Sequence, residues 1–250
     1  MARILITGAA GNIGKALTKH LSTNHNLILV DRSLNGFPER LKGDIHKVET
    51  DLTEKTAWTG LLNEIDYVIH LAANPNAFAD FDDLWESNFI IPKYLFEHAA
   101  NALNIKRIIF ASSVHAVDGY PAGEEIKVTD VPRPDGYYGI SKLYIESLAN
   151  YFAYQRGVKS IGIRIGNYTL SEDEVSEKDL IGLADIITER DFNHLIDCCL
   201  TADIGEPTMI VNGVSNNTFK RLEISTLKGL IGYNPQDNAF ELMKKNENAD

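Results

Sequence analysis

The stretch that decides the fold runs from residue 3 to residue 14 and reads RILITGAAGNIG. Its first part, residues 3–7, is apolar and β-branched and predicts a strand that enters a glycine-rich turn. Gly8 permits a tight turn, Gly11 lets backbone N–H groups approach a pyrophosphate at a helix N-terminus, and Gly14 permits close helix packing. We interpret this stretch as the first unit of a dinucleotide-binding sheet and not as an ordinary flexible turn.

A carboxylate at the end of the next strand signal indicates which dinucleotide binds. The apolar run at residues 26–31 ends in Asp31, roughly 20 residues after Gly8. A carboxylate there accepts hydrogen bonds from the adenosine ribose hydroxyls and repels a ribose phosphate. The plain alternative is a turn cap, and Arg32 beside it could still admit some phosphorylated cofactor. The pattern favours NAD.

Short β-branched runs recur along the chain, each followed by a helical pattern. Runs of this kind predict strands buried on both faces, and intervening helices require parallel strands joined by right-handed crossovers. We therefore expect an α/β fold with a doubly wound parallel sheet. The further strands are expected at 46–52, 66–73, 107–113, 160–166 and 208–213, and the helices at 11–23, 54–63, 83–103 and 137–155.

Length and composition favour one folded body over residues 1–250. A chain of 250 residues with 44% hydrophobic residues can bury a full core. Residues 1–166 carry most of the cofactor-binding signals. Residues 167–250 are expected to form mainly a small C-terminal lobe that covers the substrate, with the strand at 208–213 returning to the sheet.

The charge and the cysteines exclude several classes of function. A formal net charge of −11 repels phosphate backbones and anionic membranes, so a general nucleic-acid or membrane role lacks an electrostatic basis. Cys198 and Cys199 are adjacent, which predicts small buried residues in a reducing compartment and neither a disulfide nor a metal site. Without an apolar run of membrane-spanning length, we expect a cytoplasmic protein.

The segment RPDGYYGISK at residues 133–142 poses a choice between two adjacent tyrosines. If YGISK opens a helix, Tyr138 and Lys142 share a face, whereas Tyr137 points well away from the lysine. A nearby ammonium stabilises a phenolate and lowers the pKa of the phenol from about 10 toward a useful range for a base. An aromatic ring packed on a lysine stem is the plain alternative. Next to the glycine turn, the pattern favours Tyr138 as a base.

The segments together resemble the extended short-chain dehydrogenase/reductases, whose fingerprint is similar to TGAAGNIG, HLAA, FASS and YGISK. The resemblance runs nearly end to end. FASSVHAVDGYP, RPDGYYGISK, RIGNYT and GYNPQDNAFE are most similar to uronate dehydrogenases and to archaeal NAD-dependent glucose-6-phosphate dehydrogenases. The resemblance implies a Rossmann fold, NAD, a small-molecule sugar substrate, and a possible homo-oligomer formed through the helices at 83–103 and 137–155.

The resemblance also implies roles for single residues at the reacting end. Tyr138 is the catalytic base, Lys142 lowers its pKa and holds the nicotinamide ribose, and Ser113 orients the reacting hydroxyl. Strand alternation does not decide between Ser112 and Ser113, and the family match selects Ser113. Ser113 and Tyr138 are therefore expected to contact the substrate as well.

Other positions follow from the same resemblance and from the ends of the strands. His115 and Asn167 fall at substrate-contact positions, although a hydrogen-bonded loop histidine and a turn asparagine are the plain alternatives. Asn88 falls at a structural asparagine that supports the site. Strand ends such as Asp51 meet a cofactor that spans the carboxyl edge. The predicted cofactor-binding residues are Gly8, Gly11, Asn12, Ile13, Gly14, Asp31, Asp51, Leu52, Leu71, Ala72, Ala73, Asn88, Tyr138, Lys142 and Ile165, with no metal ligands.

Two departures from the uronate dehydrogenase pattern leave the sugar open. Those enzymes usually read Ser-Ser-Asn-His where this chain has Val114 before His115, so one amide donor to the sugar is lost. Their carboxylate-gripping arginine has no clear counterpart, because residues 171–191 offer only Lys178 and Arg190. A uronate, a neutral aldose and an aldose phosphate all remain open as substrates.

The predicted function is NAD-dependent oxidation of the anomeric hydroxyl of an aldose to a lactone. The alternative is an NAD-dependent sugar-nucleotide epimerase, which shares the first hydride transfer but needs space for a nucleotide diphosphate and usually has a longer chain. A dehydratase is disfavoured. Its Asp-Glu pair would fall near Val114 and His115, and these residues cannot supply the same acid and base. A nucleotide-sensing binding protein without chemistry is disfavoured, since serine, tyrosine and lysine are all retained.

Overall fold

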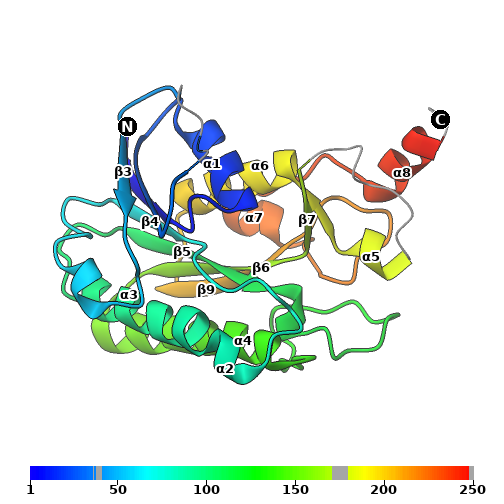
Figure 1. Cartoon of the computed structure of the whole chain (residues 1–250). Helices are drawn as coiled ribbons and strands as arrows, with labels where there is room; N and C mark the ends of the chain where they lie inside the picture. The colour runs from blue at the N-terminus through cyan, green and yellow to red at the C-terminus, as the bar shows by residue number, and fades with distance from the viewer. Residues whose placement is uncertain (36, 38–40, 171–179, 248–250) are drawn as a thin grey trace.

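The centre of the molecule is a seven-stranded parallel sheet with the strand order β3-β2-β1-β4-β5-β6-β9 (Figure 1). The structure is a computed structural model that describes residues 1–35, 37, 41–170 and 180–247. The predicted doubly wound α/β fold is confirmed. The strands are β1 (Arg3–Thr7), β2 (Asn26–Asp31), β3 (Ile45–Glu49), β4 (Tyr67–His70), β5 (Arg107–Ser113), β6 (Ser160–Ile165) and β9 (Thr208–Gly213).

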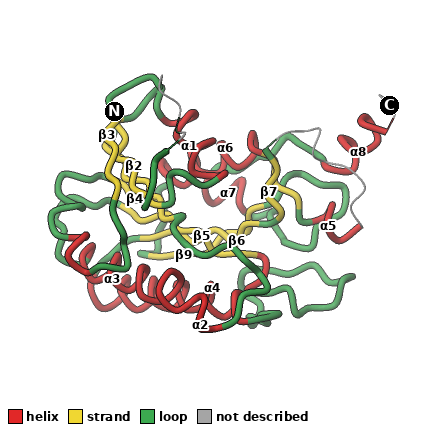
Figure 2. Tube along the Cα trace, in the orientation of Figure 1, coloured by secondary structure: helices red, strands yellow, loops and turns green. Residues whose placement is uncertain are grey.

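Helices cover both faces of this sheet (Figure 2). One face carries α1 (Asn12–Leu21), α6 (Glu189–Thr201) and α7 (Leu227–Ile231). The other carries α3 (Ile91–Ala99) and α4 (Tyr137–Arg156). The helix expected at 83–103 is divided into α2 (Phe81–Leu84), a π-helix η2 (Trp85–Ile90) and α3.

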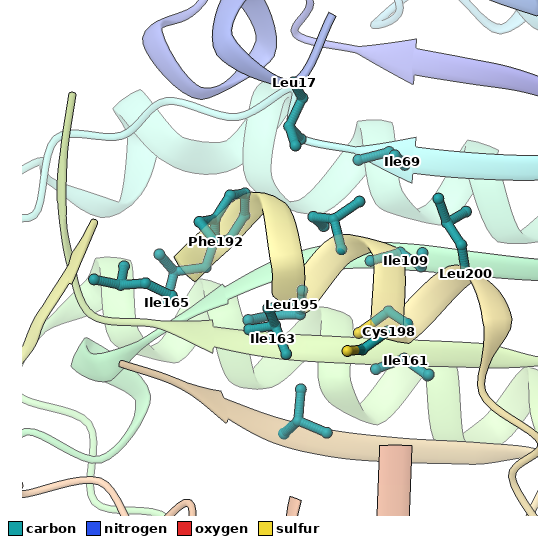
Figure 3. Packing of buried hydrophobic residues seen from close by; sticks show 14 of the residues in the cluster. Leu17, Ile69, Ile109, Ile161, Ile163, Ile165, Phe192, Leu195, Cys198 and Leu200 are labelled. Atoms are coloured by element: carbon teal, nitrogen blue, oxygen red, sulfur yellow. The ribbon is translucent and has the colours of Figure 1, made fainter. Parts of the chain in front are cut away.

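Alternate residues of β1, β2, β4, β5 and β9 enter two separate hydrophobic cores. In β1, Ile4 and Ile6 join the core under α1 and α6, whereas Leu5 joins the core under α3 and α4. Figure 3 shows the first core, in which Leu195 of α6 lies over Ile163 of β6. Because both faces are buried, the strands read as continuous apolar runs in the sequence. The predicted burial of Cys198 and Cys199 is confirmed, and both thiols are free.

The prediction of a helix at residues 54–63 is wrong. Only a short 3₁₀ helix, η1 (Lys55–Trp58), forms there, because the backbone at Thr59 is extended. The Trp58 indole is 1% exposed and donates its N–H to the Leu52 carbonyl at 3.0 Å. The local pattern favoured a regular helix, but tertiary contacts such as those of Trp58 override local propensity.

The C-terminal third contains two strands that the sequence did not predict. β7 (Asn167–Thr169) and β8 (Ile186–Thr188) form a small parallel pair, and three residues are too few to show a strand period. α5 (Leu180–Ala184) packs against α8 (Ala239–Glu247). β9 returns to β6 as predicted. The assignment of residues 167–250 to a substrate lobe stays a prediction.

A search of the described residues finds no helix with both the length and the apolar character needed to cross a bilayer.

A buried ion pair ties α4 to the sheet. Arg164 of β6 and Glu146 of α4 form two parallel N–H···O bonds, at 3.0 and 2.9 Å. Their side chains are only 2% and 10% exposed. The Ser112 hydroxyl of β5 donates to the same carboxylate at 2.6 Å. Because both charges are desolvated, removal of one partner leaves the other without compensation.

We expect Glu146→Ala to lower the free energy of unfolding by about 3–5 kcal/mol, since it strands the Arg164 guanidinium in the core. Urea unfolding measures the effect. The matched control is Glu97→Ala, which breaks an exposed i,i+4 pair with Lys93 on α3 and should cost less than about 1 kcal/mol. Equal losses in the two variants would contradict this account of the ion pair.

Candidate active site

The site lies where the strand order reverses, between β1 and β4. The chain leaves β1 for a helix on one face and leaves β4 for helices on the other face, so a crevice forms at the carboxyl ends of these strands. A cleft of about 850 Å³ opens there, and the carboxyl ends of β1 to β6 contribute to its lining. Ligands of α/β sheets bind at such points.

The glycine turn forms the floor of this cleft. Gly8 has φ 70°, and a Cβ built there would lie 2.7 Å from the Ala72 nitrogen, so no larger side chain fits. A Cβ on Gly14 would lie 2.4 Å from the Gly8 carbonyl oxygen. α1 begins at Asn12 without a side-chain cap and without an acid in its first turn. Its first N–H groups and the helix dipole therefore suit a pyrophosphate.

Two carboxylates border the cleft beyond the turn. Asp31 accepts hydrogen bonds from the backbone N–H groups of Ala10, at 2.9 Å, and Arg32, at 2.8 Å, which fix its orientation beside the glycine turn. Asp51 accepts from the N–H and the hydroxyl of Thr53, and these bonds lower its pKa. Both groups can accept hydrogen bonds from a bound nucleoside.

The structure brings almost all predicted cofactor contacts to this one cleft. The exception is Asn88, which is buried in η2 and holds the backbone of Asn74 and the hydroxyl of Ser141. Asn88 therefore joins the loop after β4 to α4, as expected of a supporting residue. The predicted residues that line the cleft are Gly8, Gly11, Asn12, Ile13, Gly14, Asp31, Asp51, Leu52, Leu71, Ala72, Ala73, Ser113, Tyr138, Lys142 and Ile165.

The two tyrosines face different surroundings, as the helical spacing predicted. Tyr138 lines the cleft, and the Lys142 Nζ lies 5.2 Å from the centre of its ring. Lys142 is 5% exposed and donates to the Ala111 carbonyl at 3.2 Å. Tyr137 is 52% exposed and packs edge-on against Phe81. A base role is therefore open to Tyr138 and not to Tyr137.

A close backbone contact brings Tyr138 to the end of β5. A Cβ on Gly139 would lie 2.1 Å from the His115 carbonyl oxygen, so only glycine lets α4 approach this loop. The Ser113 hydroxyl oxygen accepts the His115 N–H at 3.3 Å, and the His115 ring lies edge-on to Tyr138, with ring centres 5.5 Å apart. Ser112 is bonded to α4 through Glu146. This pairing leaves Ser113 as the serine available to a substrate.

A second histidine lies beneath the site and stays neutral. His70 at the end of β4 shares a 2.7 Å hydrogen bond with the Thr7 hydroxyl. Burial and, to a smaller extent, the Lys142 ammonium lower the pKa of His70 to about 3. The positive charge next to the Tyr138 phenol is therefore carried by Lys142 and not by His70.

The sequence-based prediction omits two carboxylates beside His115. Its Nδ1 lies 2.7 Å from an Asp135 oxygen and 3.9 Å from an Asp118 oxygen. The three potential ligand atoms lie within 4.8 Å of one another, but Asp118 already accepts a bond from the buried Arg221 guanidinium. Because the Arg221 guanidinium is bonded to Asp118, its positive charge disfavours a divalent cation among these three ligand atoms. The position of Asp135 in RPDGYYG, just before Tyr138, was the available signal.

The predicted sugar-binding residues are only partly brought together. His115 and Asn167 do not line the cleft, and the Asn167 amide donates to the Gly182 carbonyl at 3.2 Å. Their roles stay predictions. Arg190 is paired with Asp237 through two N–H groups and not with the acids adjacent to it in the sequence. Lys178 lies outside the described residues.

The profile of the NAD dependent epimerase/dehydratase family matches residues 4–181. The chain belongs to this family. It is similar to the L-arabinose 1-dehydrogenase (NAD(P)(+)) of Haloferax volcanii, with 33% identity over 98% of this chain and 100% of the relative. It is also similar to the NAD-dependent glucose-6-phosphate dehydrogenase of the same organism, with 30% identity over 99% and 98% of the two chains.

Solved structures agree with this membership of the epimerase/dehydratase family. The crystal structure of uronate dehydrogenase from Agrobacterium tumefaciens superposes with a TM-score of 0.87 at 28% identity, covering 100% of this chain and 90% of that chain. The family resemblance, the Rossmann fold and NAD as the cofactor, all predicted from the sequence, are confirmed.

Some cleft-lining residues of this family member carry no signal in the sequence. Thr50, Glu86 and Ser87 line the cleft although they lie outside the recognised motifs. Glu86 and Ser87 belong to η2, whose π-helical turn is not visible in a side-chain pattern. π-helical turns occur frequently at functional sites. Only the tertiary structure shows that Glu86 and Ser87 lie at the cleft.

We expect Asp31→Ala to raise the Kd of NAD about tenfold, because the ribose loses charged hydrogen-bond acceptors. The preference for NAD over NADP should narrow, since repulsion of a ribose phosphate disappears as well. Fluorescence titration with both dinucleotides measures the effect. Asp44→Ala removes the same charge from an exposed position before β3 and serves as the control. An unchanged NAD/NADP ratio in Asp31→Ala would refute this role.

Proposed function

We propose that this protein is an NAD-dependent sugar dehydrogenase that oxidises the anomeric hydroxyl of an aldose to a lactone. The observation that carries the proposal is the position of Ser113, Tyr138 and Lys142 on one cleft with the glycine turn and Asp31. The names of the relatives support it: an arabinose 1-dehydrogenase, a glucose-6-phosphate dehydrogenase and uronate dehydrogenases.

The cleft residues fit NAD. The uncapped N-terminus of α1 suits the pyrophosphate, and the Asp31 carboxylate suits the adenosine ribose. Bound there, NAD supplies the acceptor for the hydride that leaves the sugar carbon. In this proposal Lys142 also holds the nicotinamide ribose, with the N–H groups that its bond to Ala111 leaves available.

Tyr138 removes the proton of the sugar hydroxyl at its phenolic oxygen. A phenol with a pKa of about 10 is a poor base at neutral pH. The Lys142 ammonium stabilises the phenolate because the two groups lie on one face of α4 and the lysine is almost fully buried, where charges interact more strongly than in water. Because His70 is neutral, Lys142 and not His70 supplies this positive charge.

Ser113 orients the hydroxyl that reacts. Its oxygen already accepts the His115 N–H, so its own O–H is left to donate to the substrate oxygen. This bond would direct the substrate proton toward Tyr138. Because Ser113 ends a central strand and Tyr138 begins a long helix, both groups are held by rigid elements.

The proposal also covers the substrate end of the site. We assign His115 and Asn167 to sugar contacts and residues 167–250 to a lobe that covers the substrate. Support for this lobe is that Gly166 and Tyr168, directly before and within β7, line the cleft. The cytoplasmic location and the possible homo-oligomer stay predictions.

Replacement of Tyr138 with Phe should lower kcat by at least about 100-fold and leave the Kd of NAD within about twofold, because the ring stays while the titrating group is lost. Tyr137→Phe is the matched control and should keep most of the activity, since Tyr137 faces Phe81. NADH formation and NAD titration are the measurements. Equal loss of activity in the two variants would contradict the assignment of the base.

A sugar panel distinguishes the dehydrogenase from the other functions. Incubation of the protein with NAD and aldoses, uronates, sugar phosphates or nucleotide sugars should give NADH in stoichiometric proportion to a lactone product. An epimerase would convert a nucleotide sugar without net NADH, and a sensor would bind NAD without turnover. Either of these results would overturn the proposed function. NADH absorbance and product analysis by NMR provide the two readouts.

A further inference from the structure

The strongest unassigned feature near the cleft is the pairing of His115 with Asp135. The histidine Nδ1 and a carboxylate oxygen are 2.7 Å apart, although the residues lie on different elements. The histidine side chain is 27% exposed and its ring packs edge-on against Tyr138. His115 thus lies outside the lining of the cleft but directly beside Tyr138, the proposed base.

The bond determines which histidine nitrogen can contact a ligand. An ionised carboxylate only accepts hydrogen bonds, so the hydrogen of this bond belongs to Nδ1. In the neutral ring, Nε2 then carries a lone pair and acts as an acceptor. In the described part of the chain, this nitrogen has no hydrogen-bond partner. Nε2 is therefore available to a hydroxyl of a sugar bound against Tyr138.

The charges around this corner disfavour an anionic sugar. Asp118 lies 3.9 Å from the His115 Nδ1, and it shares the buried Arg221 guanidinium with Asp185. Arg221 is only 2% exposed, and its charge is already balanced by these two carboxylates. Three carboxylates thus surround one arginine and one histidine. Even with a protonated histidine, the corner has no net positive charge to offer a carboxylate or phosphate.

We propose that Asp135 is a specificity-determining positioning residue, which holds His115 so that Nε2 accepts a hydrogen bond from a hydroxyl of an uncharged aldose. This inference rests on the proposed sugar dehydrogenase function and deepens it, since it names the substrate class. Uronates and sugar phosphates are the poorer substrates because they place negative charge beside Asp135 and Asp118.

The test compares two variants of Asp135 with a control on the same loop. Asp135→Ala removes both the charge and the acceptor, whereas Asp135→Asn removes the charge but keeps an amide oxygen that can accept from Nδ1. Asp130→Asn is the matched control, because Asp130 is half-buried and, among the described residues, its carboxylate accepts a hydrogen bond only from the Lys127 backbone N–H. For each protein, kcat/KM is measured with arabinose, glucose and galactose and with glucuronate, galacturonate and glucose 6-phosphate.

The wild-type protein should prefer the best uncharged aldose over the best anionic sugar by at least about tenfold. Asp135→Ala should lower kcat/KM for the uncharged aldose about tenfold, mainly through KM, and should leave the KM of NAD within about twofold. Asp135→Asn should recover most of that loss while the preference over anionic sugars narrows. The control should match the wild type in every parameter.

Three results would overturn the inference: a wild-type preference for an anionic sugar, an unchanged preference in both Asp135 variants, or equal losses in sugar and NAD binding, which would indicate a structural role. A wild-type protein that forms no NADH from any sugar would instead overturn the proposed function. The two failures are therefore distinguishable. Thermal unfolding of each variant reports folding independently of activity.

Discussion

The site depends on one constraint of parallel sheets: the strand order reverses between β1 and β4, and the chain must leave these neighbours toward opposite faces. The reversal leaves the carboxyl ends of both strands uncovered and opens the cleft. It also forces two backbones together, since the turn at Gly8 lies against Ala72 after β4. The glycine there is a consequence of packing across the switch point as much as of the turn itself.

The reacting groups depend on a second contact, between α4 and the loop that follows β5. Gly139 lets the helix backbone meet the His115 carbonyl, and the Glu146–Arg164 pair holds the same helix to the sheet further along. Because both attachments follow Tyr138 closely in α4, they hold Tyr138 beside the end of β5, where Ser113 lies. The geometry of the proposed base therefore derives from buried contacts that take no part in chemistry.

The charged groups at individual positions of the site, and not the net charge of the protein, determine what the site can bind. A chain with a net charge of −11 accommodates a cofactor that contains two phosphates, and helix α1 offers backbone N–H groups and a dipole for this purpose. Positive charge is placed where a phenolate needs it, at Lys142, and negative charge accumulates around His115. Backbone N–H groups thus suit the anionic cofactor, whereas the carboxylates around His115 suit the uncharged sugar that is proposed as the substrate.

The sequence by itself determined the features that arise from neighbours along the chain. The glycine turn, the acid at the end of the second strand and the spacing of Tyr138 and Lys142 are local patterns, so the fold class, NAD and the candidate base could be predicted. The family resemblance selected Ser113 over Ser112, but only the tertiary structure gives a physical reason for the choice, because the Ser112 hydroxyl is bonded to Glu146 in a distant helix. It also revealed Asp118, Asp135 and Arg221 around His115, since these groups are joined by long-range contacts. The local sequence pattern does not show which charged side chains come into contact when the chain folds. These contacts set the electrostatic charge around His115, at the proposed sugar end of the site.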